Sequence, residues 1–385
     1  MLKVGIIAGE ASGDQLGAAL IVALRELAGE LAVEGMGGPR MIAAGCRPLA
    51  SIDELSVMGI VEVVRHYPRL WRLRERLVRH FLAEPPDVFV GIDVPDFVLN
   101  VEARLRAARI PTVHYVCPQV WAWRQGRIPR IKRAIDVLLA VFPFEVDFFA
   151  RYGISARFVG HPLADALPAV PVPAVARAAL GIGLDDRLVA LMPGSRSHEL
   201  ARHTDLFLAA AARIRDDDPT VRFIAGAVDP AGAAALRARR DAVAPQLPLE
   251  VFSARSPEIL TAADAALVAS GTVTLEAMLC HTPLVVAYRL APLSFRIMKA
   301  ASKTPFVAIP NILAGEAVLP EFLQNDARPE ALAAAVLRWL REPAAAEHYR
   351  RYCRAMHARL RNDAARTAAR AILELVHERA QPSRS

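Results

Sequence analysis

A serine and an arginine in the stretch 187–199 have the types and the spacing to bind a diphosphate. Ser195 and Arg196 directly follow Pro193-Gly194, which ends a short apolar run typical of a buried strand, and a helical pattern begins at Glu199. A strand, a glycine turn and a helix in that order direct backbone N–H groups and the positive end of a helix dipole to one point. The serine hydroxyl and the planar guanidinium add donors suited to phosphate oxygens. The alternative is an ordinary loop with a solvated arginine.

Two carboxylates in the first half of the chain have positions suited to proton transfer. Glu10 lies in the turn GEASGD, directly after a strand pattern over residues 4–8, and Asp93 directly follows the apolar run 88–92. The carboxyl ends of parallel strands share one edge of a sheet, where open α/β sheets bind ligands. A carboxylate there can act as a general base. Glu10 can instead favour a helix start through the dipole, and for Asp96 helix N-capping is the preferred interpretation.

The second half of the chain repeats the order of strand, glycine turn and helix. In the segment SGTVTLE the backbone at Ser270, Gly271 and Thr272 is placed to receive phosphate, and Glu276 to accept ribose hydroxyl groups. Asn311 lies in a further turn, PNILAG, as a polar amide among apolar residues.

The segment 57–81 interleaves arginine with apolar and aromatic residues. Between Ile60 and Phe81 six arginines face two glutamates, an excess of four positive charges. A basic amphipathic helix of this kind is typical of a membrane-surface element, and the alternative is an ordinary helix packed on the sheet. Pro68 predicts that the helix is broken or begins there. The residues expected to contact membrane or acyl chains are Val61, Val64, Arg69, Trp71, Arg72, Leu73 and Arg76.

Alternating strand and helix patterns must position all of these residues. One series runs to about residue 160, a segment rich in proline and alanine covers residues 162–173, and a second series follows. Two such series predict two doubly wound α/β domains with a cleft between their carboxyl edges. We expect Rossmann-like domains at 1–165 and 175–330 and C-terminal helices at 331–385. In the loop after the strand 112–116, Trp121 and Trp123 predict either a binding surface or burial under the sheet.

Composition narrows the classes of protein and partner. The chain has 385 residues, of which 54% are hydrophobic, and a net charge of +7, which favours anionic partners. No apolar run approaches the roughly 18 residues of a membrane-spanning helix, and the chain opens on a strand pattern in place of a cleavable signal. Four scattered cysteines without a CxxC pair indicate reduced thiols and no zinc framework. The turn GEASGD is not GxGxxG, so a dinucleotide site is disfavoured.

An ordered set of motifs resembles the lipid-A-disaccharide synthase family of inverting glycosyltransferases, which have a GT-B fold. The set covers residues 2–315 in order and is weaker through the C-terminal helices. Cys117 is a departure, since many members are expected to have serine there, and this affects the hydrogen bonding of its loop. The motifs are GEASGD (9–14), GGPRM (37–41), ELSVMGIVEV (54–63), GIDVPDF (91–97), HYVCPQVWAWR (114–124), GSRSHE (194–199), ASGTVTLE (269–276) and PNILAG (310–315).

The resemblance implies a reaction and its partners. UDP-2,3-diacylglucosamine would donate its sugar to the 6-hydroxyl of 2,3-diacylglucosamine 1-phosphate, giving a β-1,6-linked lipid A disaccharide 1-phosphate and UDP. Asp93 would be the base, Glu10 would orient the acceptor or assist, Ser195 and Arg196 would hold the diphosphate, and Asn311 would lie in the site. The resemblance implies no cofactor and no metal. It also implies a cytoplasmic protein, peripheral on an anionic membrane at the cytoplasmic face of the inner membrane. A homodimer is compatible with the sequence.

Two other kinds of protein share some of these features. Another UDP-sugar enzyme of GT-B type with a lipid-linked acceptor, or a UDP-N-acetylglucosamine epimerase, would share the turns of the second half but gives no reason for GIDVPDF and VWAWR. A nucleic-acid-binding protein would fit the positive charge. We expect no nucleic acid partner, because the arginines cluster with apolar residues and no RNP, KH or helix-turn-helix pattern is present.

Overall fold

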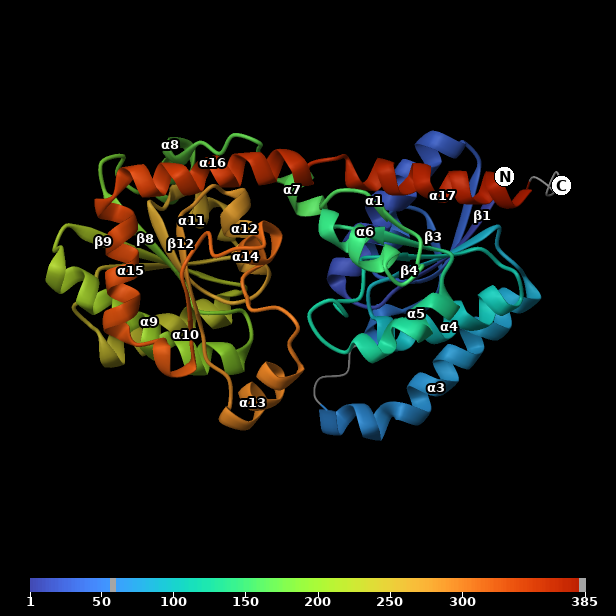
Figure 1. The fold of residues 1–385 in the computed structure, drawn as a ribbon, viewed down its shortest axis with the longest axis horizontal. Helices are drawn as coiled ribbons and strands as arrows, with labels where there is room; N and C mark the ends of the chain where they lie inside the picture. The colour runs from blue at the N-terminus through green and yellow to red at the C-terminus, as the bar shows by residue number, and fades with distance from the viewer. Residues whose placement is uncertain (56–59, 381–385) are drawn as a thin grey trace. The chain divides into compact units, whose positions relative to one another are not determined.

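The chain folds into two units, each built on one parallel β-sheet with helices packed against it (Figure 1). The structure, a computed structural model, describes residues 1–55 and 60–380; the side chains of residues 60–67, 292–294, 297 and 301 lie outside this description. The first unit contains Met1–Asp165 and Leu360–Ser385, and the second contains Ala166–Arg359. The predicted fold class, with two doubly wound Rossmann-like domains, is confirmed. The helices predicted as one C-terminal segment from residue 331 are divided between the two units.

The sheet of the first unit has the strand order β3-β2-β1-β4-β5-β6-β7. The order reverses direction between β1 and β4, and ligands of open α/β sheets bind outside the carboxyl ends at such a switch point. The strands are β1 (Leu2–Ala8), β2 (Leu31–Gly37), β3 (Cys46–Ser51), β4 (Val88–Ile92), β5 (Thr112–Tyr115), β6 (Val137–Ala140) and β7 (Ala156–Phe158). Every residue of β4, β5 and β6 is buried, as expected for central parallel strands covered on both faces.

Helices of the first unit form two layers around this sheet, with α1 packed against α17 and α3 packed against α4. Phe81 of α3 meets Phe89 of β4 edge to face at 5.3 Å between ring centroids, and Gly5 of β1 leaves room for the Phe81 ring. The helices are α1 (Ala11–Ala28), α2 (Pro39–Ala43), α3 (Ile60–Ala83), α4 (Pro95–Ala107), α5 (Ile128–Ala134), α6 (Pro143–Ala150), α7 (Pro162–Ala166, which ends in the second unit) and α17 (Ala364–Ala380), with the 3-10 turns η1 (Ile52–Glu54) and η2 (Gln125–Arg127).

The sheet of the second unit has the order β10-β9-β8-β11-β12-β13, with its switch point between β8 and β11. Its strands are β8 (Arg187–Met192), β9 (Val221–Ala227), β10 (Leu249–Ser253), β11 (Ala265–Ala269), β12 (Leu284–Tyr288) and β13 (Glu321–Leu323). Its helices are α8 (Pro173–Leu180), α9 (Ser197–Asp217), α10 (Pro230–Val243), α11 (Ser256–Ala262), α12 (Thr272–Leu279), α13 (Pro292–Ala301), α14 (Ile309–Ala314), α15 (Pro329–Arg341) and α16 (Pro343–Leu360), with η3 (Gln324–Asp326).

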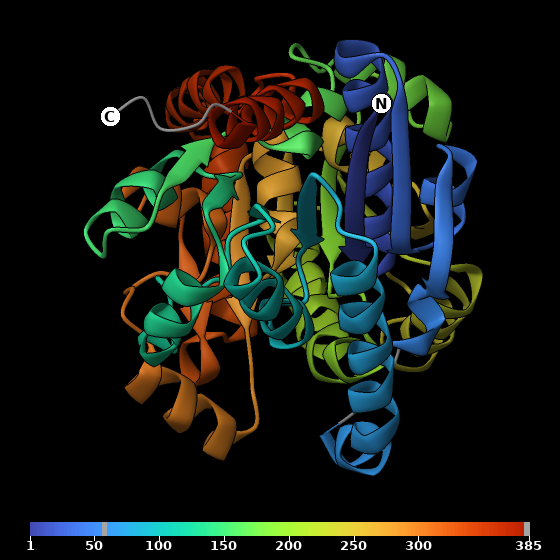
Figure 2. The ribbon, with the colours of Figure 1, turned by 90° about the vertical axis from the view of Figure 1, so that its right-hand side faces the viewer.

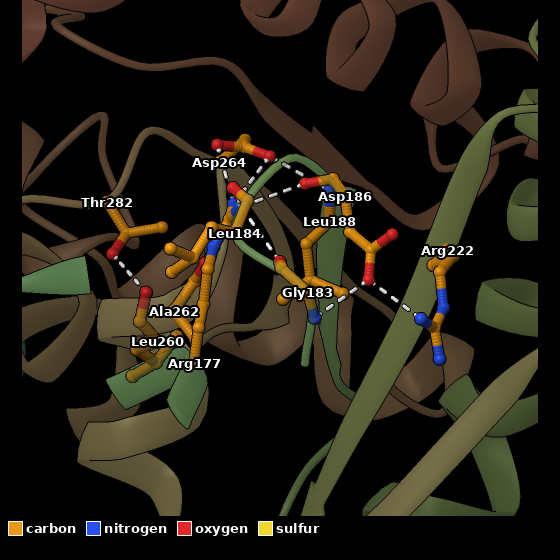
Figure 3. Close-up of polar contacts among 10 residues, drawn as sticks. All are labelled: Arg177, Gly183, Leu184, Asp186, Leu188, Arg222, Leu260, Ala262, Asp264 and Thr282. Carbon is orange, nitrogen blue, oxygen red and sulfur yellow. Dashed lines mark hydrogen bonds and ion pairs between the residues drawn. The ribbon is translucent and has the colours of Figure 1, made fainter. Parts of the chain in front are cut away.

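A buried arginine ties the amino ends of β8 and β11 to α8 (Figure 3). Arg177 is 6% exposed, and its guanidinium contacts both carboxylate oxygens of Asp264 at 3.0 and 3.1 Å. It also donates to the carbonyl oxygens of Leu184, of Asp186 (3.0 Å) and of Ala262 (2.9 Å). The guanidinium N–H groups of Arg177 are thus hydrogen-bonded within the protein. We conclude that this arginine stabilises the amino-end edge of the sheet.

The end of the chain completes the first unit. The carboxylate of Asp165 accepts hydrogen bonds from the backbone N–H groups of Asn362 (3.0 Å), Asp363 (3.0 Å) and Ala364 (2.6 Å), and so caps α17. Ion pairs join Arg366 of α17 to Glu26 of α1, and Arg379 to Asp136. The first unit is therefore made from two segments that are distant in the sequence.

Some elements differ from those that the sequence predicts. Helix α3 continues through Pro68, which was expected to break or begin it. On the C-terminal side of Pro68, Leu73, Leu77 and Phe81 bury one face of the helix in the core of the first unit. The strands β3, β12 and β13 were not predicted. β3 is a half-exposed edge strand and β13 has only three residues, whereas the apolar run of β12 was overlooked although the strand is buried.

Candidate active site

The switch point of the first sheet brings Glu10 and Asp93 together. Ala8 of β1 pairs in register with Ile92 of β4, so the residues that follow each strand lie side by side at the carboxyl edge. Gly9 contacts Val94 so closely that a Cβ on Gly9 would overlap the valine methyl group. The prediction that both carboxylates lie at one edge of the sheet is confirmed by this pairing. Their chemical roles remain predictions.

The backbone at Asp93 has an unusual conformation. Asp93 (φ 53°) and Val94 (φ 42°) are both left-handed, which costs free energy for any residue with a Cβ and most for a β-branched one. The Asp93 N–H donates to the Tyr115 carbonyl oxygen at 3.0 Å, and Asp93 Oδ1 accepts from the Val94 N–H at 2.8 Å. Asp93 is half-buried, and no ion pair to it is present among the described residues. Its carboxylate thus stays available to a ligand.

Glu10 and Asp14, one helical turn apart, have different surroundings. Glu10 is exposed at the N-cap of α1, and its side chain makes no capping hydrogen bond. Asp14 is buried and accepts from the backbone N–H groups of Gly38 (2.8 Å), Arg40 (3.0 Å) and Met41 (3.0 Å). Asp14 therefore fixes the turn GGPRM, a role that the sequence analysis missed although Asp14 is the last residue of the motif GEASGD.

Asp96 is not the N-cap that the sequence analysis preferred. Val94 occupies the N-cap of α4, and Asp96 lies in the first turn, since the left-handed pair at 93–94 starts the helix two residues earlier. Its carboxylate forms an ion pair with Arg127 at 2.7 Å. This contact connects the beginning of α4 to the loop that follows β5.

A buried Glu–His pair lies beneath the same edge. Glu102 of α4 and His114 of β5 are fully buried, with 2.8 Å between Glu102 Oε1 and His114 Nδ1. Burial raises the pKa of Glu102. Gly91, two residues before Asp93, must be glycine because a Cβ would overlap the Glu102 carboxylate. The sequence analysis missed this pair; its signal was a glutamate within the apolar face of a helix.

Glu145 organises the loop after β5. Its carboxylate is buried and accepts from the Phe142 backbone N–H at 3.0 Å and from Trp121 Nε1 at 3.1 Å. The Cys117 thiol is a further hydrogen-bond partner, so the cysteine noted as a departure keeps the loop bonded. Burial raises the pKa of Glu145 to about 7, although its hydrogen bonds oppose this change. Trp121 is partly buried here, whereas Trp123 is 42% exposed.

In the second unit the turn after β8 differs from its prediction in one respect. Ser195 and Arg196 are exposed as expected, but their backbone N–H groups already donate to Glu199 Oε2, at 3.0 and 3.2 Å. The expectation that these N–H groups are free for a diphosphate was wrong. The side chain of Glu199, the third residue of α9, accepts hydrogen bonds from both of them. Gly194 (φ 128°) is required, since a Cβ would overlap the Glu199 side chain.

The turn after β11 has its polar groups bound within the chain. Ser270 Oγ donates to the Val307 carbonyl oxygen at 3.0 Å, and Glu276 accepts from Ser256 Oγ at 2.6 Å. Burial raises the pKa of Glu276. Gly271 (φ 149°) and Thr272 are exposed where α12 begins, so the backbone there is accessible at the switch point of the second sheet.

Asn311 is buried, and its amide is used entirely by the chain. Nδ2 donates to the Leu319 carbonyl oxygen (3.0 Å) and to Glu321 Oε1 (2.7 Å), while Oδ1 accepts from the N–H groups of Val318 (2.9 Å) and Leu319 (3.1 Å). Glu321 also accepts from the N–H groups of Val307 and Ala308. Asn311 therefore holds the segment that Ser270 contacts, so any effect on a ligand is indirect.

The residues predicted to contact a membrane lie on α3, whose N-terminal turns project beyond the sheet of their own unit (Figure 2). Arg69, Trp71 (48% exposed) and Arg72 are exposed. The prediction for Leu73 was wrong, because its side chain is buried in the core with Leu77, Val78 and Phe81. Arg76 is exposed but pairs with Glu54 at 3.3 Å. The side chains of Val61 and Val64 lie outside the described residues. Over residues 1–55 and 60–380, no helix is both long and apolar enough to span a membrane.

One group of side chains among the described residues has metal-ligand types at close range: Glu34, His80 and Glu84. Glu34 Oε1 lies 2.8 Å from His80 Nε2, and its other oxygen contacts Arg47. Glu34 lies in the middle of β2 and not at the carboxyl-edge turns. Arg47 contacts a Glu34 carboxylate oxygen that would otherwise be available to bind a metal ion.

Comparisons with known proteins agree on a family. The model of the lipid-A-disaccharide synthetase family matches residues 4–375. The lipid-A-disaccharide synthase of Alkalilimnicola ehrlichii is 48% identical over 97% of this chain and 98% of that protein, and the enzyme of Pseudomonas paraeruginosa is 46% identical over 98% and 99%.

Solved structures with low identity share the fold. The UDP-GlcNAc 2-epimerase of Neisseria meningitidis bound to UDP-GlcNAc has a TM-score of 0.64 at 12% identity, covering 98% of this chain and 100% of that one. A glycosyltransferase from Rickettsia africae has a TM-score of 0.61 at 10% identity, covering 99% of each chain. The fold therefore belongs to the GT-B group of glycosyltransferases and epimerases. The family match and the identity to curated relatives over nearly the whole length show that this chain belongs to the lipid-A-disaccharide synthetase family.

Proposed function

We propose that this enzyme transfers 2,3-diacylglucosamine from its UDP derivative to the 6-hydroxyl of 2,3-diacylglucosamine 1-phosphate. The products are the β-1,6-linked disaccharide 1-phosphate and UDP. The observation that carries this proposal is the pair of carboxylates at the switch point of the first sheet. Asp93 is held there by a left-handed backbone turn, with Glu10 on the neighbouring strand end. A proton acceptor at this place is what a hydroxyl nucleophile needs.

The reaction is a single displacement at the anomeric carbon. The bond from the acceptor O6 to this carbon forms while the bond from the carbon to the diphosphate oxygen breaks, which inverts an α-linked donor to a β product. Asp93 receives the proton of the 6-hydroxyl, and the electron pair of the broken bond leaves with UDP. Glu10, exposed beside it, orients the acceptor or assists the base.

The leaving diphosphate needs positive charge at the position where negative charge develops. Arg196 and Ser195 supply an exposed guanidinium and a hydroxyl at the turn after β8. The exposed backbone at Gly271 and Thr272, where α12 begins, supports a second contact with phosphate, and Glu276 is our candidate for the ribose hydroxyl groups. Asn311 contributes by holding the segment 307–321 behind Ser270.

Incubation of the purified enzyme with both substrates tests the reaction. We expect a disaccharide 1-phosphate and an equal amount of UDP, detected by mass spectrometry, with a β-1,6 linkage by NMR. Each substrate alone should give no disaccharide. Conversion of UDP-N-acetylglucosamine to its 2-epimer without a lipid acceptor would contradict the proposal, and so would transfer to a different position of the acceptor.

We further propose that α3 brings the enzyme to an anionic membrane, at the cytoplasmic face of the inner membrane. Its exposed Arg69, Trp71 and Arg72 support this, since each cation near an anionic surface contributes about 1 kcal/mol. Arg76 contributes less, because Glu54 is within 3.3 Å of it. The acyl chains of both substrates lie in a membrane, so docking would shorten their path to the site.

Vesicle sedimentation tests this docking. Changing Arg69 and Arg72 to Ser should reduce binding to anionic vesicles, and binding of the parent should weaken as salt rises. Activity on vesicle-embedded substrates should fall with it, while activity on detergent-solubilised substrates should change much less. The matched control changes two other exposed arginines of this unit to Ser, Arg133 of α5 and Arg151, which follows α6. Equal sedimentation of both double variants would show that α3 is an ordinary packed helix.

A further inference from the structure

The loop between β5 and α5, residues 116–127, carries an exposed cation that the proposed reaction does not yet use. The Cζ atom of Arg124 lies 4.0 Å from the ring centroid of Trp123, and both residues are exposed. In the part of the chain that the structure describes, the Arg124 side chain has no hydrogen-bonded acceptor and no ion-pair partner. By contrast, Arg104, Arg106, Arg127 and Arg157 of the same unit each pair with a carboxylate.

The loop that presents this pair is fixed at several points. The indole N–H of Trp121 binds the buried Glu145, and its ring packs edge to face on Phe144 at 5.0 Å. Arg124 itself adopts a left-handed conformation (φ 58°) at the start of η2. A backbone held in this region, together with a guanidinium stacked on an indole, restricts the freedom of the Arg124 side chain before any ligand arrives. A preorganised donor loses less entropy on binding.

Both ends of the loop are attached to the segment that carries Asp93. At one end Tyr115 pairs in register with Ile92, and its carbonyl oxygen accepts from the Asp93 N–H. At the other end Arg127 pairs with Asp96, three residues after Asp93. A ligand whose hydroxyl reaches Asp93 therefore lies beside this loop.

We propose that Trp123 and Arg124 form the subsite for the 1-phosphate of the acceptor. Arg124 would bind the phosphate oxygens with its fork of N–H donors, and Trp123 would pack against the sugar ring next to them. This inference rests on the proposed function, in which the acceptor hydroxyl must reach Asp93. The diphosphate of the donor is assigned to Arg196 in the second unit, so the acceptor phosphate needs a separate cation in the unit that holds the base.

Kinetics with two acceptors test the subsite. The parent, Arg124→Ala and Arg124→Lys are compared in detergent micelles with saturating UDP-2,3-diacylglucosamine, while either 2,3-diacylglucosamine 1-phosphate or its analogue without the phosphate is varied. The KM of Arg124→Ala for the phosphorylated acceptor should rise ten- to a hundredfold, the range expected when a hydrogen bond to a charged group is lost. The KM for the donor and kcat should change by less than about threefold, and Arg124→Lys should recover part of the loss.

The analogue without the phosphate separates recognition from structure. With this analogue, the parent and Arg124→Ala should have the same KM, because the group that Arg124 binds is missing from the substrate. The control Arg133→Ala, which removes an exposed arginine from the next helix, should behave as the parent with both acceptors. An equal loss with both acceptors, or no loss with either, would overturn the subsite while leaving the proposed function intact. A parent enzyme that forms no disaccharide would instead refute the proposed function.

Discussion

The carboxyl ends of the two sheets use their polar groups in opposite ways. In the first unit the strained turn at Asp93 and Val94 leaves a carboxylate with one internal hydrogen bond, and Glu10 beside it is exposed. In the second unit the turns are satisfied from within, since Glu199 takes the N–H groups at 195–196 and the Asn311 amide is fully bonded. The difference indicates that the carboxyl edge of the first sheet keeps carboxylates available for a ligand. At the carboxyl edge of the second sheet most polar groups are hydrogen-bonded within the protein, and few side chains remain to contact a ligand.

Substitution of Asp93 is the strongest test of this difference between the two sheets. Asp93→Asn keeps the shape and removes the basicity, so kcat should fall at least about a hundredfold while binding of the donor stays nearly unchanged. Steady-state kinetics and calorimetry with UDP measure the two quantities. Glu10→Gln is the matched control and should have a smaller effect on kcat. A larger fall in kcat for Glu10→Gln than for Asp93→Asn would instead identify Glu10 as the base and Asp93 as the assisting group.

At the carboxyl edge of the second sheet, Arg196 is the side chain that we expect to contribute most to UDP binding. Arg196→Ala should weaken UDP binding about ten- to a hundredfold, because a hydrogen bond to a charged group contributes roughly 1.5–3 kcal/mol. Calorimetry with UDP measures this. Arg215→Ala, at the other end of α9, removes the same charge away from the turn and should leave the affinity nearly unchanged. Equal effects of the two variants would mean that only overall charge attracts the nucleotide.

A half-buried histidine gives the stability of the first unit a pH dependence. Burial lowers the pKa of His161 to about 4, so below pH 6.5 the unfolded chain binds a proton that the folded chain does not. The stability contributed by the neutral ring is present above pH 6.5 and is lost as the pH falls towards 4. Urea unfolding at pH 7.5 and pH 5 should therefore show a loss that is smaller in His161→Gln, by about 1–2 kcal/mol. His377→Gln, at an exposed site of the same unit, should keep the loss of the parent.

The smallest effect is expected at Glu199. If its carboxylate occupies the N–H groups that a diphosphate would approach, Glu199→Gln keeps an acceptor for them and removes a negative charge. UDP should then bind up to about fivefold more tightly, the range for a charge at a helix N-terminus. Calorimetry at low and high salt measures this gain, which should shrink with screening. Weaker binding in Glu199→Gln would show that the carboxylate acts only to hold the turn.

Much of the fold follows from local patterns in the sequence. The apolar run that became β4 was predicted with its observed bounds, residues 88–92, since a central parallel strand is buried on both faces. The edge strands β3 and β13 carry too little apolar signal to be found in this way. Helix α3 passes through Pro68 although proline disfavours a helix interior, and Leu77 and Phe81, which follow Pro68, pack it against the core.

The candidate site was predictable in place but not in detail. Asp93 and Glu10 each follow a strand, so parallel pairing alone puts them at one edge. The hydrogen bonds that acidic side chains form with the backbone were not predictable. They depend on partners distant in the sequence or on the rotamer of a single side chain. Asp14, which holds residues 38–41, is an example of the first, and Glu199, which turns back on its own helix, is an example of the second.

The capping of α17 by Asp165 has a consequence for biosynthesis. The second unit is one continuous segment, so a ribosome delivers all of it before the first unit has received its last helix. Until residues 360–380 emerge, α1 lacks the helix that packs along it, and apolar surface of the first unit stays open to water. The domain that begins first is therefore completed last, and premature termination before residue 360 would leave a complete second unit joined to an incomplete first one.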